Sequence, residues 1–331
     1  MSQAVTGALG PIPKRVEVYE VGPRDGLQNE LRTLATADKA RLIEALIAAG
    51  LKRIEVTSFV SPRWIPQLAD AEKLLGALGK RPGVTFTALV PNAKGLDRAH
   101  DAGLAEAAVF LSATESHSKK NINKSVGEAI AVARDIAAEA KSLGMRVRCY
   151  LSTVWGCPYE GLTPVSRVVD VVGQLKDIGF YQLSLADTIG VGTPGQTQQI
   201  ISEVSKLVPV SQLALHLHDT RGTALANALV GMSMGVSTFD SSIGGLGGCP
   251  YAPGAAGNLA TEDLVFMLDG MAIETGVSLG KLVEAGELAQ ELIGRRLSGK
   301  YLQAALGERE KQAARVRTSL PLPATTGRGA G

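Results

Sequence analysis

Short apolar segments alternate with helical patterns along most of this chain of 331 residues. Segments of this kind, rich in β-branched and apolar residues, are typical of buried β-strands. Eight of them occur, at 16–21, 53–57, 84–90, 107–111, 146–151, 181–185, 213–217 and 238–243. Because strands separated by helices form parallel sheets, this rhythm predicts an α/β fold, and eight repeats favour a closed TIM (β/α)8 barrel. A doubly wound sheet is the alternative, but no GxGxxG motif follows the first strand.

The helical patterns divide the chain into a barrel and an additional C-terminal part. They lie at 38–49, 67–78, 126–142, 165–178, 195–207, 224–234 and 262–275, followed by two more at 279–297 and 301–315. We therefore expect a flexible N-terminus at 1–15, a catalytic barrel domain at 16–275, and C-terminal helices packing on the barrel at 276–315. The Pro-, Gly- and Thr-rich end, 316–331, is expected to be disordered.

Composition narrows the class of protein. The formal net charge is only +2 and aromatic residues make up 4% of the chain, so we expect no nucleic-acid or membrane partner. Segments of 18 apolar residues, which a membrane-spanning helix requires, do not occur. Cys149, Cys157 and Cys249 are odd in number and form no CxxC pair, which favours a reducing compartment. A cytoplasmic enzyme fits these features.

Polar residues gather where the predicted strands end, and in a barrel the active site lies at that rim. They are Arg24 and Asp25 after the first strand, Glu55 at the second, Tyr150 and Ser152 at the fifth, Asp187 at the sixth, His216 and His218 at the seventh, and Cys249 and Asn258 after the eighth. Each carboxylate taken alone could be a helix cap or a surface charge. Their convergence on one rim is harder to explain by packing and predicts an active site there.

The His216-x-His218 pair indicates a metal site. Residues two apart on a strand point to the same side, so both imidazoles can reach one ion. With Asp25 and Asn258 they supply two nitrogens and two oxygens, a set that suits Mg²⁺ or Mn²⁺ with positions left for substrate oxygens. Zinc is the rival, particularly if Cys249 were a ligand. However, Cys249 lies in the glycine-rich run 244–258, and a thiol in a mobile loop is a poor fixed ligand.

Seven motifs spread along the chain carry a family resemblance. They are EVGPRDGLQNE (20–30), IEVTSFVSPRWIPQ (54–67), KKNIN (119–123), GCPYEG (156–161), DTIGVGTPG (187–195), HLHDT (216–220) and GGLGGCPYAPGAAGNLATEDLV (244–265). Together they resemble the hydroxymethylglutaryl-CoA lyase family, metal-dependent TIM-barrel lyases, from about residue 16 to 297. The GPRDG and HxHDT motifs are shared with the wider group of barrel metallolyases and Claisen-type synthases. The cysteine-bearing loop is more specific to the lyases.

The resemblance implies a role for each matching residue. Asp25, His216, His218 and Asn258 match the divalent-metal ligands, and Arg24 matches the arginine that stabilises the thioester oxygen as an enolate. Cys249 matches the catalytic cysteine of a flexible loop, while Glu55 and Asp187 match active-site acids. The implied reaction is the retro-Claisen cleavage of 3-hydroxy-3-methylglutaryl-CoA to acetyl-CoA and acetoacetate, as in leucine and ketone-body metabolism. The implied partner is the acyl-CoA substrate, and the helices expected after the barrel favour a homodimer.

Several alternatives remain open at this point. Ala186, Cys149 and the pair at 117–118 depart from the family pattern near the rim, which leaves room for a longer 3-hydroxy-3-alkylglutaryl-CoA substrate. A Claisen-type synthase acting on acetyl-CoA and a 2-oxo acid is a second alternative, and a non-catalytic acyl-CoA or metal-binding barrel is a third. Lys119 and Lys120 are weak candidates for CoA phosphate contacts, because a solvated charge pair explains them equally well.

Overall fold

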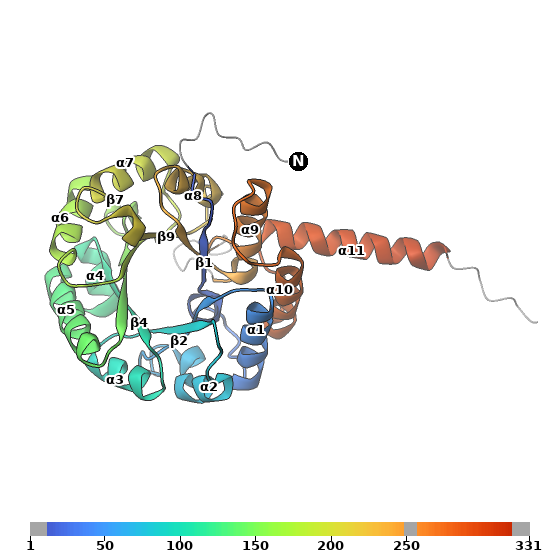
Figure 1. Cartoon of the computed structure of the whole chain (residues 1–331), viewed down its shortest axis with the longest axis horizontal. Coiled ribbons are helices and arrows are strands. Elements are labelled where there is room, and N and C mark those ends of the chain that lie inside the picture. The colour runs from blue at the N-terminus through green and yellow to red at the C-terminus, as the bar shows by residue number, and fades with distance from the viewer. Residues whose placement is uncertain (1–11, 248–256, 320–331) are drawn as a thin grey trace, which may run out of the picture.

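The computed structural model describes residues 12–247 and 257–319, and within them eight parallel strands close into a barrel (Figure 1). The strands are β1 Glu17–Glu20, β2 Arg53–Ser58, β3 Thr85–Leu89, β4 Glu106–Ser112, β5 Arg146–Ser152, β8 Gln182–Asp187, β9 Leu213–Leu217 and β10 Thr238–Ser241. Neighbours in the barrel follow chain order, and β1 closes it by pairing with both β10 and β2. The predicted fold class is confirmed, with all eight strands at their predicted places.

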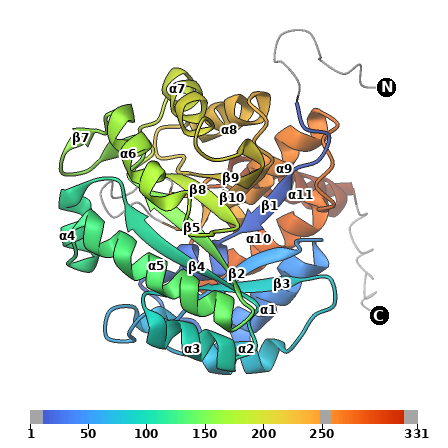
Figure 2. The ribbon, with the colours of Figure 1, turned by 60° about the vertical axis from the view of Figure 1, so that its left-hand side comes forward.

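Helices surround the strands and bury one face against them (Figure 2). They are α1 Thr36–Ala48, α2 Ala71–Leu78, α3 Ala93–Asp101, α5 Val126–Ser142, α6 Val165–Leu175, α7 Pro194–Val204, α8 Ala224–Ser233 and α9 Thr261–Gly270. The buried positions of α5 recur at intervals of three and four residues, which is the period of a helix with one apolar face. None of the helices in the described ranges is long and apolar enough to cross a membrane.

Several short elements were not predicted from the sequence. They are the π-helical turn η1 Gly22–Gly26, the 3-10 turns η2 Pro66–Leu68, η3 Val210–Gln212 and η4 Ile243–Gly245, the helices α3 and α4 Glu115–Ile122, and the hairpin strands β6 Gly156–Cys157 and β7 Gly161–Leu162. Most span only two to five residues, too few for hydrophobic periodicity to develop. Helix α3 escaped prediction because its nine residues, AKGLDRAHD, include a glycine and four charged side chains.

Two helices follow the barrel. Helix α10, Leu279–Ile293, packs against α1 and α9, and α11, Lys300–Ser319, begins against α9 and α10 before extending away from the barrel (Figure 1). The sequence placed the start of a disordered tail at 316, whereas α11 continues to Ser319.

The interior of the barrel is polar near its centre. On β5, Arg148 and Tyr150 point inward, whereas Cys149 and Leu151 between and beyond them join the apolar layer under the helices. Arg148 and Asp240 of β10 are completely buried there and form an ion pair. Buried charges are retained only where they are paired, so this centre is held by specific contacts rather than by apolar packing.

Candidate functional site

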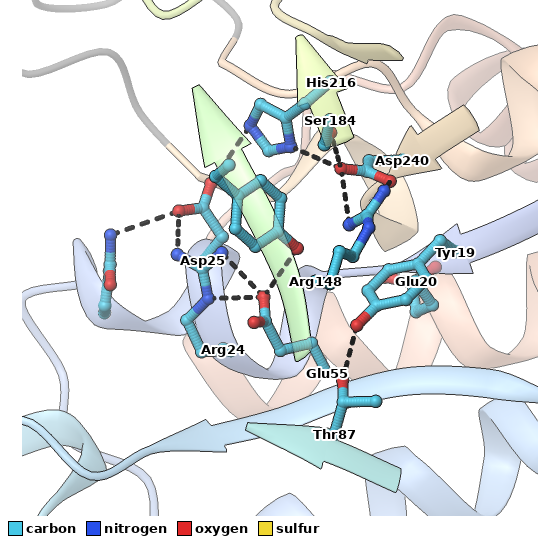
Figure 3. A network of polar contacts seen from close by, with 12 residues as sticks. Tyr19, Glu20, Arg24, Asp25, Glu55, Thr87, Arg148, Ser184, His216 and Asp240 are labelled. Atoms are coloured by element: carbon cyan, nitrogen blue, oxygen red, sulfur yellow. Dashed lines mark hydrogen bonds and ion pairs between the residues drawn. The ribbon is translucent and has the colours of Figure 1, made fainter. Parts of the chain in front are cut away.

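Most of the predicted site residues that the structure describes meet at the carboxyl end of the barrel, and Figure 3 shows Arg24, Asp25, Glu55 and His216 among them. Arg24 and Asp25 lie in η1, directly after β1, and Glu55 lies within β2. Gly22 opens η1, and its backbone nitrogen donates a hydrogen bond to Oε1 of Glu20 at 2.8 Å. At Gly26 a side chain would collide with Leu246, so this glycine allows the segment after β10 to approach the turn.

Asp25, His216 and His218 form a group that could hold a metal ion, because one ligand atom from each lies within 4.8 Å of the others. The Nε2 atoms of the two histidines are 3.3 Å apart, and Nε2 of His216 lies 4.0 Å from Oδ2 of Asp25. The two imidazoles therefore lie on the same side of the chain at the end of β9, as their spacing predicted. All three side chains are largely shielded from solvent.

The charge states in this group suit a cation. Burial raises the pKa of Asp25, but Arg24 and the two histidines outweigh it and lower that pKa to about 2. Burial, aided by His216, lowers the pKa of His218 to about 4. At neutral pH the group thus offers a carboxylate and a neutral imidazole with a lone pair. Nδ1 of His218 is buried and has no hydrogen-bond partner among the described residues.

Asn258, the fourth predicted ligand, lies beside Asp25 and His218. It pairs with His218 in an isolated antiparallel bridge, and its Nδ2 donates to Oδ2 of Asp25 at 2.7 Å and to the carbonyl of Leu246 at 3.2 Å. The side chain amide therefore lies beside the carboxylate with its nitrogen toward it. Asn258 ties the segment after β10 to η1, so the four predicted ligands come together from three parts of the barrel rim.

Arg24 is fixed by carboxylates on both sides. Its Nε and Nη2 donate to Oε2 of Glu55 at 2.7 and 2.6 Å, and its Nη1 lies 2.5 Å from Oδ1 of Asp25. Tyr150 donates its hydroxyl to the same Oε2 atom of Glu55 at 3.1 Å. Burial raises the pKa of Glu55, although Arg24 opposes the shift. This arrangement holds a permanent cation in one orientation next to the candidate metal ligands.

A further carboxylate supports the histidines and was missed by sequence reasoning. Oδ2 of Asp240 lies 3.2 Å from Nδ1 of His216, and Asp240 is also the partner of Arg148. Burial raises the pKa of Asp240, but the Arg148 guanidinium outweighs it and lowers the pKa below its usual range. The one signal in the sequence was a charged residue in the middle of each of two apolar strands, at 148 and 240.

Asp187 does not lie with the others. Its carboxylate accepts hydrogen bonds from the backbone nitrogens of Val191 at 3.0 Å and Gly192 at 2.8 Å, and so closes the turn that follows β8. Burial raises its pKa, and these backbone donors oppose the shift. The neighbouring Ala186 and Thr188 line the cavity described next, whereas Asp187 does not. Cys249 lies outside the described residues.

A cavity of about 680 Å³ opens beside these residues and leads from the candidate metal group towards α4. Arg24, His216 and Tyr150 line one end, and Lys120 lines the other. The ammonium of Lys120 lies 4.0 Å from the ring centroid of Tyr159. Lys119 does not line the cavity and instead forms an exposed ion pair with Glu128 at 3.4 Å. Of the two lysines proposed for phosphate contacts, only Lys120 faces the cavity.

The chain is similar to known proteins over most of its length. The profile of the HMGL-like family matches residues 15–289. Mitochondrial hydroxymethylglutaryl-CoA lyase of Bos taurus is 51% identical over 299 residues, 90% of this chain and 92% of the relative. The crystal structure of the Bacillus subtilis HMG-CoA lyase superposes with a TM-score of 0.87 at 48% identity, covering 89% of this chain and 99% of that one. An Acinetobacter baumannii HMG-CoA lyase, solved in complex with coenzyme A and 3-methylmalate, superposes with a TM-score of 0.83 at 34% identity, covering 96% and 100%.

Proposed function

Because the chain belongs to the HMGL-like family, we propose that it is an enzyme that cleaves 3-hydroxy-3-methylglutaryl-CoA to acetyl-CoA and acetoacetate. In this retro-Claisen reaction the C3 hydroxyl loses its proton, the C2–C3 bond breaks, and the electron pair of that bond forms the enolate of acetyl-CoA. One observation carries the proposal: Arg24 and a cation-binding group share one end of a single cavity. The metabolic role is the breakdown of leucine or the formation of ketone bodies.

We propose that Asp25, His216, His218 and Asn258 hold Mg²⁺ or Mn²⁺. A mixed set of carboxylate, amide and imidazole ligands without a described thiol suits these ions. A divalent cation bound here supplies Lewis acidity that lowers the pKa of the substrate hydroxyl and orients its oxygens. The carboxylate of Asp25 and the neutral imidazole of His218 are the protein's contribution to that binding.

Arg24 is proposed to stabilise the enolate. Its guanidinium is fixed by Glu55 and Asp25 before substrate binds, so little reorganisation is needed as charge develops on the thioester oxygen. Glu55 then acts by orienting Arg24, and Tyr150 orients Glu55 in turn. Glu55 itself is not proposed to transfer a proton.

The remaining predicted residues keep proposed roles of different kinds. Cys249 is proposed as the acid that delivers a proton to the enolate carbon, on the strength of the loop motif. Asp187 is proposed to shape the turn beside Thr188, through which it influences the cavity indirectly. Lys120 is proposed to meet a CoA phosphate, because it is a cation at the cavity end away from Arg24.

Compartment and assembly are part of the same proposal. Cys149 and Cys157 are buried free thiols, which supports a reducing location such as the cytoplasm. We propose a homodimer in which the helices after the barrel, α10 and α11, take part. Light scattering on the purified chain measures the mass in solution, and a monomer at all concentrations would contradict the dimer.

The function is tested with purified protein, Mg²⁺ and a panel of thioesters. 3-Hydroxy-3-methylglutaryl-CoA should yield acetyl-CoA and acetoacetate, identified by mass spectrometry. A preference for a 3-hydroxy-3-alkylglutaryl-CoA with a longer chain would change the substrate, and condensation of acetyl-CoA with a 2-oxo acid would indicate a synthase. Absence of acetyl-CoA from every thioester, in protein that binds Mn²⁺, would overturn the lyase.

A further inference from the structure

Arg148 lies at the centre of the barrel beside Asp240 (Figure 3), has no exposed surface, and has a partner for each of its side-chain nitrogens. Its Nη1 and Nη2 donate to Oδ2 and Oδ1 of Asp240 at 3.1 and 2.5 Å, and its Nε donates to Oε1 of Gln182 at 2.8 Å. The guanidinium also lies between the rings of Tyr19 and Tyr150, 4.0 and 4.8 Å from their centroids. Arginine in such a two-pronged pair is held in a single orientation.

The carboxylate of Asp240, held by Arg148, also contacts His216 of the histidine pair. Its Oδ2 accepts from Ser184 at 3.0 Å and lies 3.2 Å from Nδ1 of His216. A carboxylate can only accept hydrogen bonds, so the proton of the His216 imidazole must be on Nδ1. Nε2 of His216 then carries a lone pair, directed at His218, whose Nε2 is 3.3 Å away.

We infer that Arg148 and Asp240 form a positioning pair, which fixes the tautomer of His216 so that its Nε2 lone pair is available to the cation. This inference rests on the proposed function, because it assigns an affinity-setting role beside the proposed metal site. Because the two Nε2 atoms are only 3.3 Å apart, they carry at most one proton between them, and the contact with Asp240 keeps the proton of His216 away from this pair. Carboxylates behind metal-binding histidines commonly change metal affinity by about 10–100-fold when removed.

The same barrel contains a matched control. Glu106 on β4 is a buried carboxylate that pairs with Arg53 and Arg146, and Tyr181 donates to it at 3.0 Å. Arg53 also lies over the ring of Tyr181, 5.8 Å from its centroid. Like the pair of Arg148 and Asp240, this cluster joins a buried carboxylate to guanidinium groups, but none of its polar contacts among the described residues reaches a histidine. Comparing variants of Glu106 and Asp240 therefore separates the effect of losing a buried charge from the effect of losing the contact that positions His216.

The first measurement reads the tautomer of His216 directly in the wild-type protein. Nitrogen-15 NMR of the metal-free wild-type protein at about pH 8, above the ordinary histidine pKa, reports which ring nitrogen of His216 is protonated. We expect Nδ1–H for His216, with the signal assigned by its loss in His216→Ala. An Nε2–H tautomer would overturn the inference, whether or not the protein cleaves any thioester. This arm therefore separates the failure of the inference from the failure of the proposed function.

The second measurement is Mn²⁺ affinity, followed by the electron paramagnetic resonance signal of the free ion. Asp240→Asn keeps the size of the side chain but removes its charge, and we expect Mn²⁺ binding about 10–100-fold weaker than in wild type. Glu106→Gln should bind Mn²⁺ as wild type does. Equal affinity in Asp240→Asn and wild type, in protein with unchanged circular dichroism, would overturn the inference. If Asp240→Asn does not fold, Ser184→Ala takes its place, because it removes one donor to Asp240. We expect this variant to lose less Mn²⁺ affinity than Asp240→Asn would. Unchanged affinity in Ser184→Ala would then contradict the inference.

Discussion

At the scale of single residues, Arg24 is the side chain whose loss should separate chemistry from folding. Its guanidinium is held by Glu55 and Asp25, and glutamine removes the positive charge while keeping an amide donor. We expect Arg24→Gln to lower kcat by about 10²–10³-fold, because a fixed donor to a developing oxyanion contributes that much to the rate. Steady-state kinetics with 3-hydroxy-3-methylglutaryl-CoA and Mg²⁺ provide the measurement.

Two controls make the Arg24 result specific. Circular dichroism should show that Arg24→Gln is folded. Tyr150→Phe should cost less activity, because it removes one hydrogen bond to Glu55 and leaves the Arg24 guanidinium in place. Normal turnover in Arg24→Gln would remove the proposed enolate role from this residue.

Single residues differ in how far the sequence revealed them. His216 and His218 could be predicted as a pair, because a spacing of two on a strand fixes their relative direction. Arg148 and Asp240 could not, since they are 92 positions apart and pair only once the barrel closes. Asp187 ends a strand at the predicted rim, and the sequence did not indicate that its carboxylate accepts hydrogen bonds from the backbone of its own turn.

At the scale of elements, helix α5 shows why some boundaries could be predicted without error. Ser125 accepts a hydrogen bond from the backbone of Glu128 at 3.2 Å, and Oε2 of Glu128 accepts from the Ser125 backbone at 2.6 Å. This reciprocal capping box is visible in the sequence, and the predicted helix 126–142 coincides with the observed one. Helix α4 has eight residues and only two buried positions, so its sequence gave no comparable period.

The capping box should contribute measurably to stability. We expect Ser125→Ala to lower the free energy of unfolding by about 1 kcal/mol, the usual effect of losing an N-cap side chain. Ser142→Ala is the control at the other end of the same helix, where the hydroxyl donates to the carbonyl of Glu139 at 2.7 Å in an exposed position. Denaturant titration compares the two, and equal changes in both variants would contradict a specific capping effect.

The turn η4 is anchored by two buried carboxyl groups. Oε1 of Glu20 accepts from the backbone of Ile243 at 2.9 Å, Oε2 of Glu20 accepts from Thr261 at 2.6 Å, and Oε2 of Glu262 accepts from the backbone of Gly244 at 2.7 Å. Burial raises the pKa of Glu20 to about 7 and that of Glu262 to about 8. In the chain, this turn comes shortly before the segment that contains Cys249.

The raised pKa of Glu262 predicts a specific pH dependence. Below the ordinary pKa of 4.5 the carboxyl is protonated in both states, whereas between 4.5 and about 8 only the unfolded chain ionises. Stability contributed by the buried acid is therefore lost as pH rises through this window. Glu262→Gln should resemble the protonated acid, so its free energy of unfolding should rise relative to wild type from pH 5 to 8, by up to about 1.4 kcal/mol per pH unit.

Denaturant titrations at several pH values measure this difference. Glu291→Gln, at an exposed position of α10, is the control and should follow wild type throughout. A difference between Glu262→Gln and wild type that stays constant from pH 5 to 8 would mean that the carboxyl ionises alike in the folded and unfolded states.

At the scale of the whole molecule, closure of the barrel brings distant segments into one site. Asp25 follows the first strand, His216 and His218 lie at the seventh, and Asn258 follows the eighth. The rule that active residues lie at the carboxyl ends of barrel strands was enough to predict this meeting. The polar centre beneath it could not be predicted, because inward positions of a barrel are usually apolar and the sequence does not indicate which strands supply opposite charges.

This assembly predicts that a bound cation stabilises the whole fold. The unfolded chain does not hold these side chains together, so the ion binds the folded state and raises its stability by mass action. We expect Mn²⁺ at a hundred times its dissociation constant to raise the free energy of unfolding by about 2.7 kcal/mol. Denaturant titration with and without Mn²⁺ measures the gain, and removing the ion with a chelator should reverse it.

Two variants decide whether this gain comes from the proposed site. His218→Ala should lose most of the gain, because His218 supplies one of the three clustered ligand atoms. Ser125→Ala should start from a lower stability but show the full gain, since the N-cap of α5 takes no part in the cluster. An equal gain in wild type and His218→Ala would place the stabilising ion elsewhere on the protein, because the same mass-action increment would then arise without one of the proposed ligands.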